Sequence, residues 1–195
     1  MIKIEKKEDC CGCTACYNSC PRKAISMKPD QEGFLYPLVN VEKCIDCGLC
    51  DSVCPVKNKM EIEQFDRSAY ALRANSSQVV STSTSGGFVS PLAEWVFEHD
   101  GVVCGATYDD EFRVIHKISG GGTKEFRGSK YVQSDLNDCF AKIKIYLEQG
   151  SLVCFIGTTC QVYGLMTYLK KKYRNLLTID LVCHGTPSPK LWEKY

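Results

Sequence analysis

The N-terminal part of the chain repeats one cysteine pattern at a constant offset. Cys10, Cys13, Cys16 and Cys20 have the spacing C-x2-C-x2-C-x3-C and are followed by Pro21. The same pattern recurs 34 residues later, in Cys44, Cys47, Cys50, Cys54 and Pro55. A repeat of this kind predicts two copies of one supersecondary unit, which together present eight thiols.

The spacing of the thiols favours iron-sulfur clusters. Three thiolates at intervals of three residues, on a loop that winds around a small object, can reach three corners of a cubane, and the fourth cysteine points back toward the other repeat. Disulfides are disfavoured because the start MIKIEKKEDC lacks the apolar stretch of an export signal, so we expect a cytoplasmic protein with reduced thiols. Structural zinc usually joins two separated pairs of ligands instead.

Residues 1–58 resemble a bacterial-type two-cluster ferredoxin domain of the α+β class. The resemblance implies crossed ligation: one 4Fe-4S cluster on Cys10, Cys13, Cys16 and Cys54, and the other on Cys44, Cys47, Cys50 and Cys20. Gly12 and Gly48 lie between ligands, where the backbone must pass close to the cluster. Cys11 falls outside the pattern and is interpreted as a spare loop thiol. Residues 24–28 and 34–40 are expected to form a hairpin.

Composition excludes other classes. Lys+Arg 24 against Asp+Glu 23 gives a formal net charge of +1, so no basic excess favours a nucleic-acid partner. No apolar run approaches the length of a membrane span, and we therefore expect none.

After a polar linker at 59–67, residues 68–195 alternate helical and extended patterns, which predicts an α/β domain with a mainly parallel sheet. Strands are expected at 68–74, 101–108, 114–118, 152–156 and 176–182. Helices are expected from Ser85-Gly86-Gly87 to 99, from a cap at Asp135 to 150, at 161–172 with Val162, Leu165, Met166 and Leu169 inward, and from Ser188 onward. Because the chain stops at Tyr195 inside that last helix, we expect the domain to be truncated at its C-terminus.

Two polar loops are expected directly after parallel strands, at 157–161 and 183–188. Ligands of open α/β sheets bind beyond the carboxyl ends of the strands, so we expect Cys160 and Cys183 to face one pocket. They could bind a further cluster, approach a flavin or support the loops. Cys104, Cys139 and Cys154 fall within apolar patterns and are interpreted as core residues.

Four motifs resemble, in order, those of the coenzyme F420 hydrogenase/dehydrogenase beta-subunit family: STSGGF at 83–88, GSKYVQS at 128–134, FIGTTCQ at 155–161 and LVCHGTPSP at 181–189. The resemblance implies a flavoprotein that carries FAD beside its iron-sulfur clusters, with coenzyme F420 as a candidate substrate. Thr159 stands where the family commonly has proline, which loosens that loop without removing its cysteine.

The candidate cofactor-binding residues are Ser85, Gly86, Gly87, Gly128, Ser129, Lys130, Tyr131, Cys160 and Cys183. Ser85-Gly86-Gly87 at a helix start suits a pyrophosphate, although a helix cap with a tight turn is the alternative. Lys130 could place a cation near the flavin's pyrimidine end. His184 could donate to a flavin or carry a proton, or it could make a structural hydrogen bond.

Two functional classes follow. The first is an oxidoreductase in which a flavin exchanges hydride with a small-molecule donor or acceptor, and the clusters pass electrons to or from a redox partner protein or subunit. The second is a non-catalytic electron-carrier module of a larger complex. Flavin retained after purification would discriminate the two.

Overall fold

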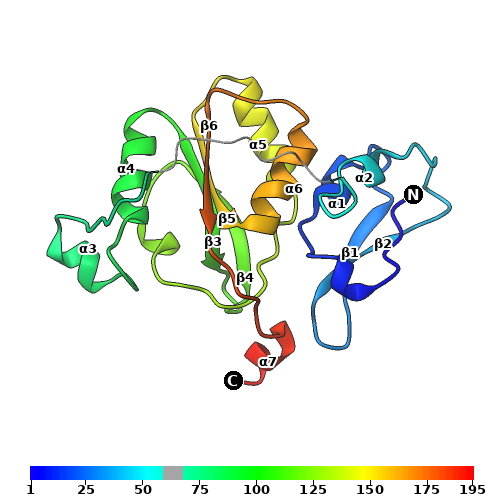
Figure 1. Ribbon diagram of the computed structural model, residues 1–195, viewed down its shortest axis with the longest axis horizontal. Helices are drawn as coiled ribbons and strands as arrows, with labels where there is room; N and C mark the ends of the chain where they lie inside the picture. The colour runs from blue at the N-terminus through cyan, green and yellow to red at the C-terminus, as the bar shows by residue number, and fades with distance from the viewer. Residues whose placement is uncertain (59–67) are drawn as a thin grey trace.

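The computed structural model describes residues 1–58 and 68–195, and the expected linker at 59–67 lies outside the described residues. Figure 1 shows a small unit built from the N-terminal residues beside a larger unit with a central sheet. None of the helices within the described ranges is long and apolar enough to cross a membrane.

The N-terminal unit repeats its backbone as well as its cysteines. Helix α1 (Ala15–Ser19) and helix α2 (Leu49–Ser52) begin 34 residues apart, each directly before the third cysteine of its run. Strands β1 (Ile25–Pro29) and β2 (Leu35–Val39) pair antiparallel between them, which confirms the expected hairpin. A short 3-10 helix, η1 (Lys7–Asp9), precedes the first run. The unit has the ferredoxin-like α+β fold expected from the sequence.

The second unit is built on a four-stranded sheet in the order β4-β3-β5-β6. Its strands are β3 (Val102–Tyr108), β4 (Val114–Ser119), β5 (Val153–Thr158) and β6 (Leu176–Leu181). Strands β3, β5 and β6 run parallel and β4 runs antiparallel to β3, so the sheet is mixed and mostly parallel, as expected.

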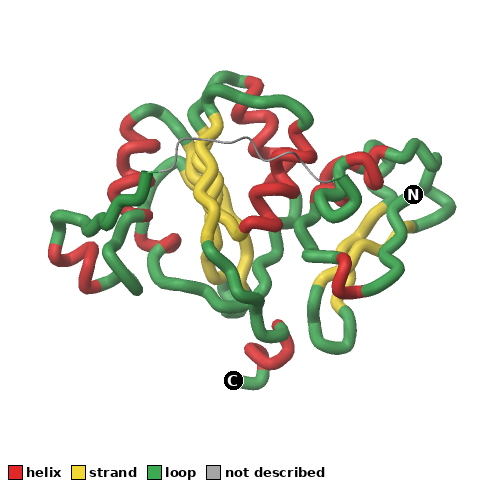
Figure 2. Tube along the Cα trace, in the orientation of Figure 1, coloured by secondary structure: helices red, strands yellow, loops and turns green. Residues whose placement is uncertain are grey.

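Helices cover both faces of this sheet (Figure 2). Helices α5 (Cys139–Glu148) and α6 (Thr159–Leu169) lie on one face, where Phe140 and Leu165 pack on Phe155. Helix α4 (Val89–Glu98) and the 3-10 helix η2 (Lys124–Phe126) lie on the other, over Val103 and Cys154. Two short helices, α3 (Ser77–Ser81) and α7 (Pro189–Glu193), complete the unit. Cys104, Cys139 and Cys154 are buried, which confirms them as core residues.

Several local expectations are wrong. Residues 68–74, all described, form no strand; the N–H of Ala74 instead donates to the carbonyl of Gly86. Asp135 does not cap α5, which begins at Cys139, because its carboxylate accepts from the N–H of Asn137 in a preceding turn. Met166 is 36% exposed rather than inward. Helix α6 ends at Leu169 rather than 172, because Lys170 takes a left-handed conformation.

The expected loop at 157–161 is also replaced by regular structure. Strand β5 continues to Thr158 and helix α6 starts at Thr159, with no loop between them. A capping box explains the direct connection: the Thr158 side chain accepts from the N–H of Gln161, and the Gln161 side chain accepts from the N–H of Thr158 at 2.9 Å. Cys160 therefore sits in the first turn of a helix.

The two units share one core. Ala15 and Val53 of the N-terminal unit belong to the same buried cluster as Phe140 of α5 and Leu165 of α6. The hydroxyl of Thr167 in α6 donates across the junction to the carbonyl of Val53 at 2.7 Å. The N-terminal unit is thus docked on the α5–α6 face.

Candidate iron-sulfur site and strand-end segments

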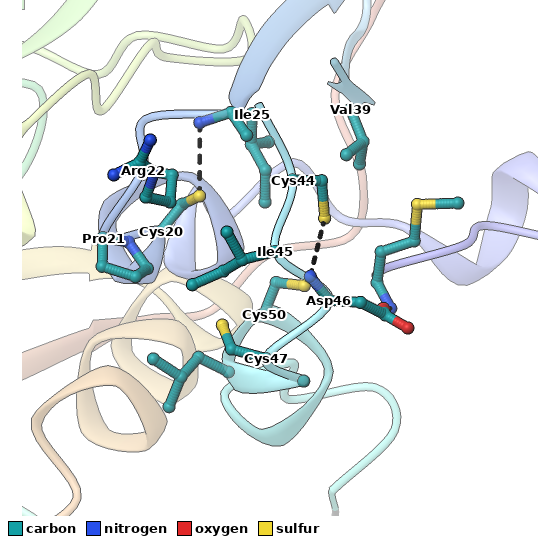
Figure 3. Close-up of a pocket in the computed structure, with 14 residues that line it drawn as sticks. Cys20, Pro21, Arg22, Ile25, Val39, Cys44, Ile45, Asp46, Cys47 and Cys50 are labelled. Carbon is teal, nitrogen blue, oxygen red and sulfur yellow. Dashed lines mark hydrogen bonds and ion pairs between the residues drawn. The ribbon is translucent and has the colours of Figure 1, made fainter. Parts of the chain in front are cut away.

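The eight thiols of the two cysteine runs line two separate pockets, four in each. The first pocket is lined by Cys10, Cys13, Cys16 and Cys54. The second is lined by Cys44, Cys47, Cys50 and Cys20, whose sulfur atoms surround one space in Figure 3. Each run contributes three thiols to one pocket and its fourth thiol to the other. This is the division that crossed ligation requires.

Left-handed backbone positions shape both cysteine loops. In the first loop, φ is +65° at Gly12 and +60° at Thr14; in the second, +49° at Asp46 and +73° at Gly48. These positions correspond at the 34-residue offset, so both loops bend at the same two places. In each loop one bend is made by a glycine, and the other is made by Thr14 in the first loop and by Asp46 in the second. Gly12 has a second constraint, because a Cβ there would lie 2.5 Å from Nε2 of Gln133.

Backbone N–H groups point at the sulfur atoms. The N–H of Asp46 donates to Cys44 Sγ at 3.4 Å, and that of Gly12 donates to the equivalent Cys10. The N–H of Ala24 reaches Cys20 Sγ at 3.3 Å (Figure 3). The N–H of Ile2 reaches Cys50 Sγ at 3.1 Å. Such bonds stabilise negative charge on sulfur, which is the charge that thiolate ligands of a cluster carry.

Burial opposes negative charge on two thiols of the first pocket, Cys10 and Cys16. Burial, with the nearby thiols of Cys10, Cys54 and Cys50, raises the pKa of Cys16 to about 12. Burial also raises the pKa of Cys10. Without iron, burial therefore keeps the Cys10 and Cys16 thiols neutral, and bound iron would supply the positive charge that makes them thiolates. The donor set of four thiols in each pocket and the N–H bonds to sulfur fit a 4Fe-4S cluster in each pocket.

The structure brings two of the candidate flavin segments together. The N–H of Ser129 donates to Thr84 Oγ1 at 3.0 Å, which joins the 128–131 segment to the loop before α4. Ser85, Gly128, Ser129 and Tyr131 are exposed, so hydroxyls and one aromatic ring face solvent from this pair of segments. A Cβ on Gly86 would collide with the carbonyl oxygen of Leu72, so close backbone packing already requires that glycine.

Lys130 and His184 differ in their surroundings. The Lys130 ammonium donates to the carbonyls of Glu125 at 3.1 Å and Arg127 at 2.9 Å, and burial lowers its pKa. An ammonium has three N–H donors, and these two bonds use two of them. The Lys130 ammonium also lies over the Tyr108 ring, 5.9 Å from its centroid. His184 is exposed, in the segment after β6.

Cys160 and Cys183 follow neighbouring parallel strands, because Thr158 of β5 pairs with Leu181 of β6. Their surroundings nevertheless differ. The Cys160 thiol is partly buried and 3.2 Å from Thr158 Oγ1, and the nearby Cys11 thiol of the N-terminal unit, with burial, raises its pKa. Cys183 is exposed, and its sulfur accepts from the N–H of Gly185 at 3.4 Å. A common pocket for the two thiols stays a prediction.

Sequence reasoning missed a buried network of hydrogen-bonded side chains near the end of β5. His116 of β4 contacts the carbonyl of Ile156 through Nε2 at 3.1 Å and Ser134 Oγ through Nδ1 at 2.8 Å. Gln161 Nε2 donates to the same Ser134 oxygen at 2.9 Å. Burial lowers the pKa of His116 to about 4, so the ring is neutral. The only signal in the sequence was a histidine within an apolar strand pattern.

Two known protein families match parts of this chain, one in each unit. Residues 9–58 match the family described as "4Fe-4S dicluster domain", and residues 150–195 match the C terminus of the family described as "Coenzyme F420 hydrogenase/dehydrogenase, beta subunit". The first match contains all eight cysteines, and the second contains β5, α6 and β6. The chain thus has a domain of the type that binds 4Fe-4S clusters and an iron-sulfur electron-transfer role.

Curated relatives match over part of their length. An uncharacterized polyferredoxin-like protein of Methanocaldococcus jannaschii is 39% identical over 66 residues, 28% of this chain and 39% of that protein. Pyruvate synthase subunit PorD of Thermotoga maritima is 42% identical over 55 residues, 28% of this chain and 52% of that protein. Ketoisovalerate oxidoreductase subunit VorC of Methanothermobacter marburgensis is 36% identical over 61 residues, 30% of this chain and 77% of that protein. The chain therefore spans about half or less of the first two relatives. With the two family matches, these findings show that the chain carries a 4Fe-4S dicluster ferredoxin domain at residues 9–58, followed at residues 150–195 by a segment that matches the C terminus of the coenzyme F420 hydrogenase/dehydrogenase beta subunit.

Proposed function

We propose that the chain passes electrons between a redox partner and a flavin in its second unit through two 4Fe-4S clusters. The observation that carries this proposal is the division of the eight thiols between two pockets. Cys10, Cys13, Cys16 and Cys54 would hold the first cluster, and Cys44, Cys47, Cys50 and Cys20 the second. When bound, the clusters supply one-electron redox chemistry. The role of the protein is to hold the clusters and to keep water away from the sides of the clusters that face the protein interior.

The ligand assignment is tested by removing the fourth thiol of each run. Protein reconstituted anaerobically with iron and sulfide should contain about eight iron atoms per chain, and Cys20→Ala and Cys54→Ala should each lower this to about four. Crossing is tested by adding Cys47→Ala. In the Cys20→Ala background it should remove no further iron, whereas in the Cys54→Ala background it should remove the remainder. The reverse result would mean that each run holds its own cluster.

The flavin part of the proposal rests on the family match over β5, α6 and β6 and on the exposed segments that meet through Ser129 and Thr84. In this assignment Ser85, Gly87 and Ser129 face the pyrophosphate of FAD, and Tyr131 lies along a ring. Lys130 presents one proton to an anionic group of the cofactor. Coenzyme F420 or another small hydride donor or acceptor is the proposed substrate, and the chain is proposed to work in the cytoplasm, where its thiols stay reduced.

FAD binding by the cluster-loaded chain tests this assignment, with quenching of flavin fluorescence as the readout. Tyr131 is 70% exposed, so Tyr131→Ala should leave the fold intact. Loss of one ring contact of about 1 kcal/mol should weaken FAD binding about fivefold. Tyr70→Ala is the matched control, because Tyr70 is 79% exposed and outside the proposed site. Absence of FAD binding, or equal affinity in both variants, would contradict the proposed site.

The alternative is an electron-carrier subunit without flavin. It is favoured by the relatives, since PorD is named as a subunit of pyruvate synthase and VorC as a subunit of ketoisovalerate oxidoreductase. In that case the chain would exchange electrons with a partner subunit through its clusters alone. Intact clusters together with no FAD binding would support this function over the first.

A further inference from the structure

The two cysteine loops are copies of one structure, but they differ in how far they are covered. At the 34-residue offset Cys13 corresponds to Cys47, and Ala15 corresponds to Leu49. Cys13 and Ala15 are buried. Cys47 is exposed, and Leu49 is 38% exposed. Both loops have the same bends and the same ligand thiols, so the difference comes from what surrounds each loop.

The second unit covers the first loop. A Cβ on Gly164 in α6 would lie 2.9 Å from Cys13 Sγ, so the helix packs directly on a ligand thiol. The side chain of Gln133 lies against the same loop, because a Cβ on Gly12 would be 2.5 Å from its Nε2. Gln133 lies just after the segment 128–131 of the proposed flavin site. The second unit thus meets the first loop next to this segment.

The second loop faces solvent instead. Among the described residues, all those that line the second pocket belong to the N-terminal unit. Figure 1 shows the segment before α2 on the side of this unit away from the central sheet. Ile45 is 60% exposed, whereas the corresponding Cys11 packs against the core shared by the two units. Two apolar side chains, Ile45 and Leu49, are therefore exposed on either side of the ligand Cys47.

Exposed cations lie near these apolar side chains. Arg22 lines the second pocket beside Cys20 (Figure 3), and Lys23 and Lys43 are close to ligands in the chain. All three cations are exposed and make no ion pair with the described residues. Asp46 pairs with the N-terminal ammonium at 2.7 Å, which leaves Glu42 as the unpaired carboxylate of segment 41–49. The rim of this pocket is therefore basic.

We propose that the chain exchanges electrons with its redox partner through the second cluster, and that the partner is an acidic one-electron carrier protein. Its docking face would comprise Arg22, Lys23, Lys43, Ile45 and Leu49, which surround the exposed Cys47. The proposal rests on the two-cluster function above. Apolar side chains within a charged rim are typical of protein interfaces, and opposite charge on the partner steers association.

The internal repeat supports this choice of occupant. The first loop is covered by the unit that is proposed to hold the flavin, and the second loop presents its copy of that covered surface to solvent. A second redox protein bound to this face would meet the second cluster as the second unit meets the first. In each exchange the partner loses one electron and the second cluster gains it, or the reverse, and no covalent bond forms or breaks.

Anaerobically reconstituted chains with one cluster each test this route. Cys54→Ala should keep only the second cluster, and Cys20→Ala only the first. Fully reduced flavodoxin is the probe, because it is an acidic protein that gives up one electron with an absorbance change distinct from that of the clusters. In stopped-flow mixing it should reduce Cys54→Ala about tenfold faster than Cys20→Ala, because the second unit covers the first loop. Midpoint potentials measured on both chains correct the rates for driving force.

Surface variants test the docking face with both clusters in place. Ile45→Glu puts a carboxylate among the apolar side chains of the face and should slow electron entry from flavodoxin about tenfold. Ile145→Glu is the matched control, because Ile145 is 54% exposed in α5 of the second unit, and it should change the rate no more than about twofold. Lys43→Glu should also slow electron entry and should make the rate less dependent on salt.

Iron content keeps this proposal distinguishable from the proposed function. If the unaltered chain binds no cluster, the proposed function fails. If it binds about eight iron atoms, equal rates for the two one-cluster chains, or a faster rate for Cys20→Ala, would overturn the route through the second cluster. Equal rates for Ile45→Glu and Ile145→Glu, or no reduction of the unaltered chain by flavodoxin, would overturn the docking face. If Ile45→Glu loses iron, Lys43→Glu decides in its place.

Discussion

Acid should destabilise the second unit through one buried histidine. Ile156 offers His116 a carbonyl oxygen, which only accepts, so Nε2 carries the ring proton and Nδ1 accepts from the Ser134 hydroxyl. Gln161 donates to the Ser134 oxygen and accepts from the N–H of Thr158, so every group in this chain has a partner. A second proton on His116 Nδ1 would point at Ser134 Oγ. The Ser134 hydroxyl proton would then lose Nδ1, its acceptor among these hydrogen-bonded side chains.

The magnitude follows from the pKa of His116, which burial lowers from 6.5 to about 4. Lys130 is the charged group that contributes, and it acts in the same direction. Between pH 6.5 and 4 the unfolded state binds the proton and the folded state does not, so the stability is fully present above this window and is lost as pH falls through it. Lowering the pH from 7.5 to 5.5 should cost about 1.3 kcal/mol of unfolding free energy.

Urea denaturation followed by tryptophan fluorescence is the assay, because Trp95 in α4 and Trp192 in α7 both report on the second unit. His116→Gln removes the titrating group, so its unfolding free energy should fall by about 1.3 kcal/mol less between pH 7.5 and 5.5 than that of the unaltered chain. His184→Gln is the matched control, since His184 is exposed. Equal pH dependence in the unaltered chain and His116→Gln would refute the reasoning.

Two further predictions concern the junction between the units. Gly164→Ala would place a Cβ 2.8 Å from Cys13 Cβ, so it should destabilise the protein by about 1–3 kcal/mol and disturb the first cluster more than the second; the test is urea denaturation together with the two cluster signals. Gly121→Ala, with no atom within 4 Å of the new Cβ, is its control, and equal effects would contradict the packing argument. Thr167→Val keeps the shape of the side chain but leaves the carbonyl of Val53 without its 2.7 Å hydrogen bond, so the unfolding free energy should fall by about 1 kcal/mol; no change would mean that this bond contributes nothing net.

Local sequence was sufficient to predict several features of this protein. The cysteine spacing indicated which eight thiols act together, because spacing within a loop fixes which side chains can surround one small object. The hairpin and the strands β3, β4, β5 and β6 followed from short patterns bounded by turns. The buried face of α5 followed from its helical period, although its first residue did not, since Asp135 satisfies a turn instead of a helix end.

The tertiary structure determined which of these segments contact one another. Residues 68–74 looked like a strand, but they meet the loop at Gly86 instead of a sheet edge. Cys11 looked like a spare loop thiol, and only the docking of the two units packs it against their shared core. His116, Ser134 and Gln161 come from three separate segments. Contacts of this kind join residues that are far apart in the sequence, so no local sequence pattern encodes them.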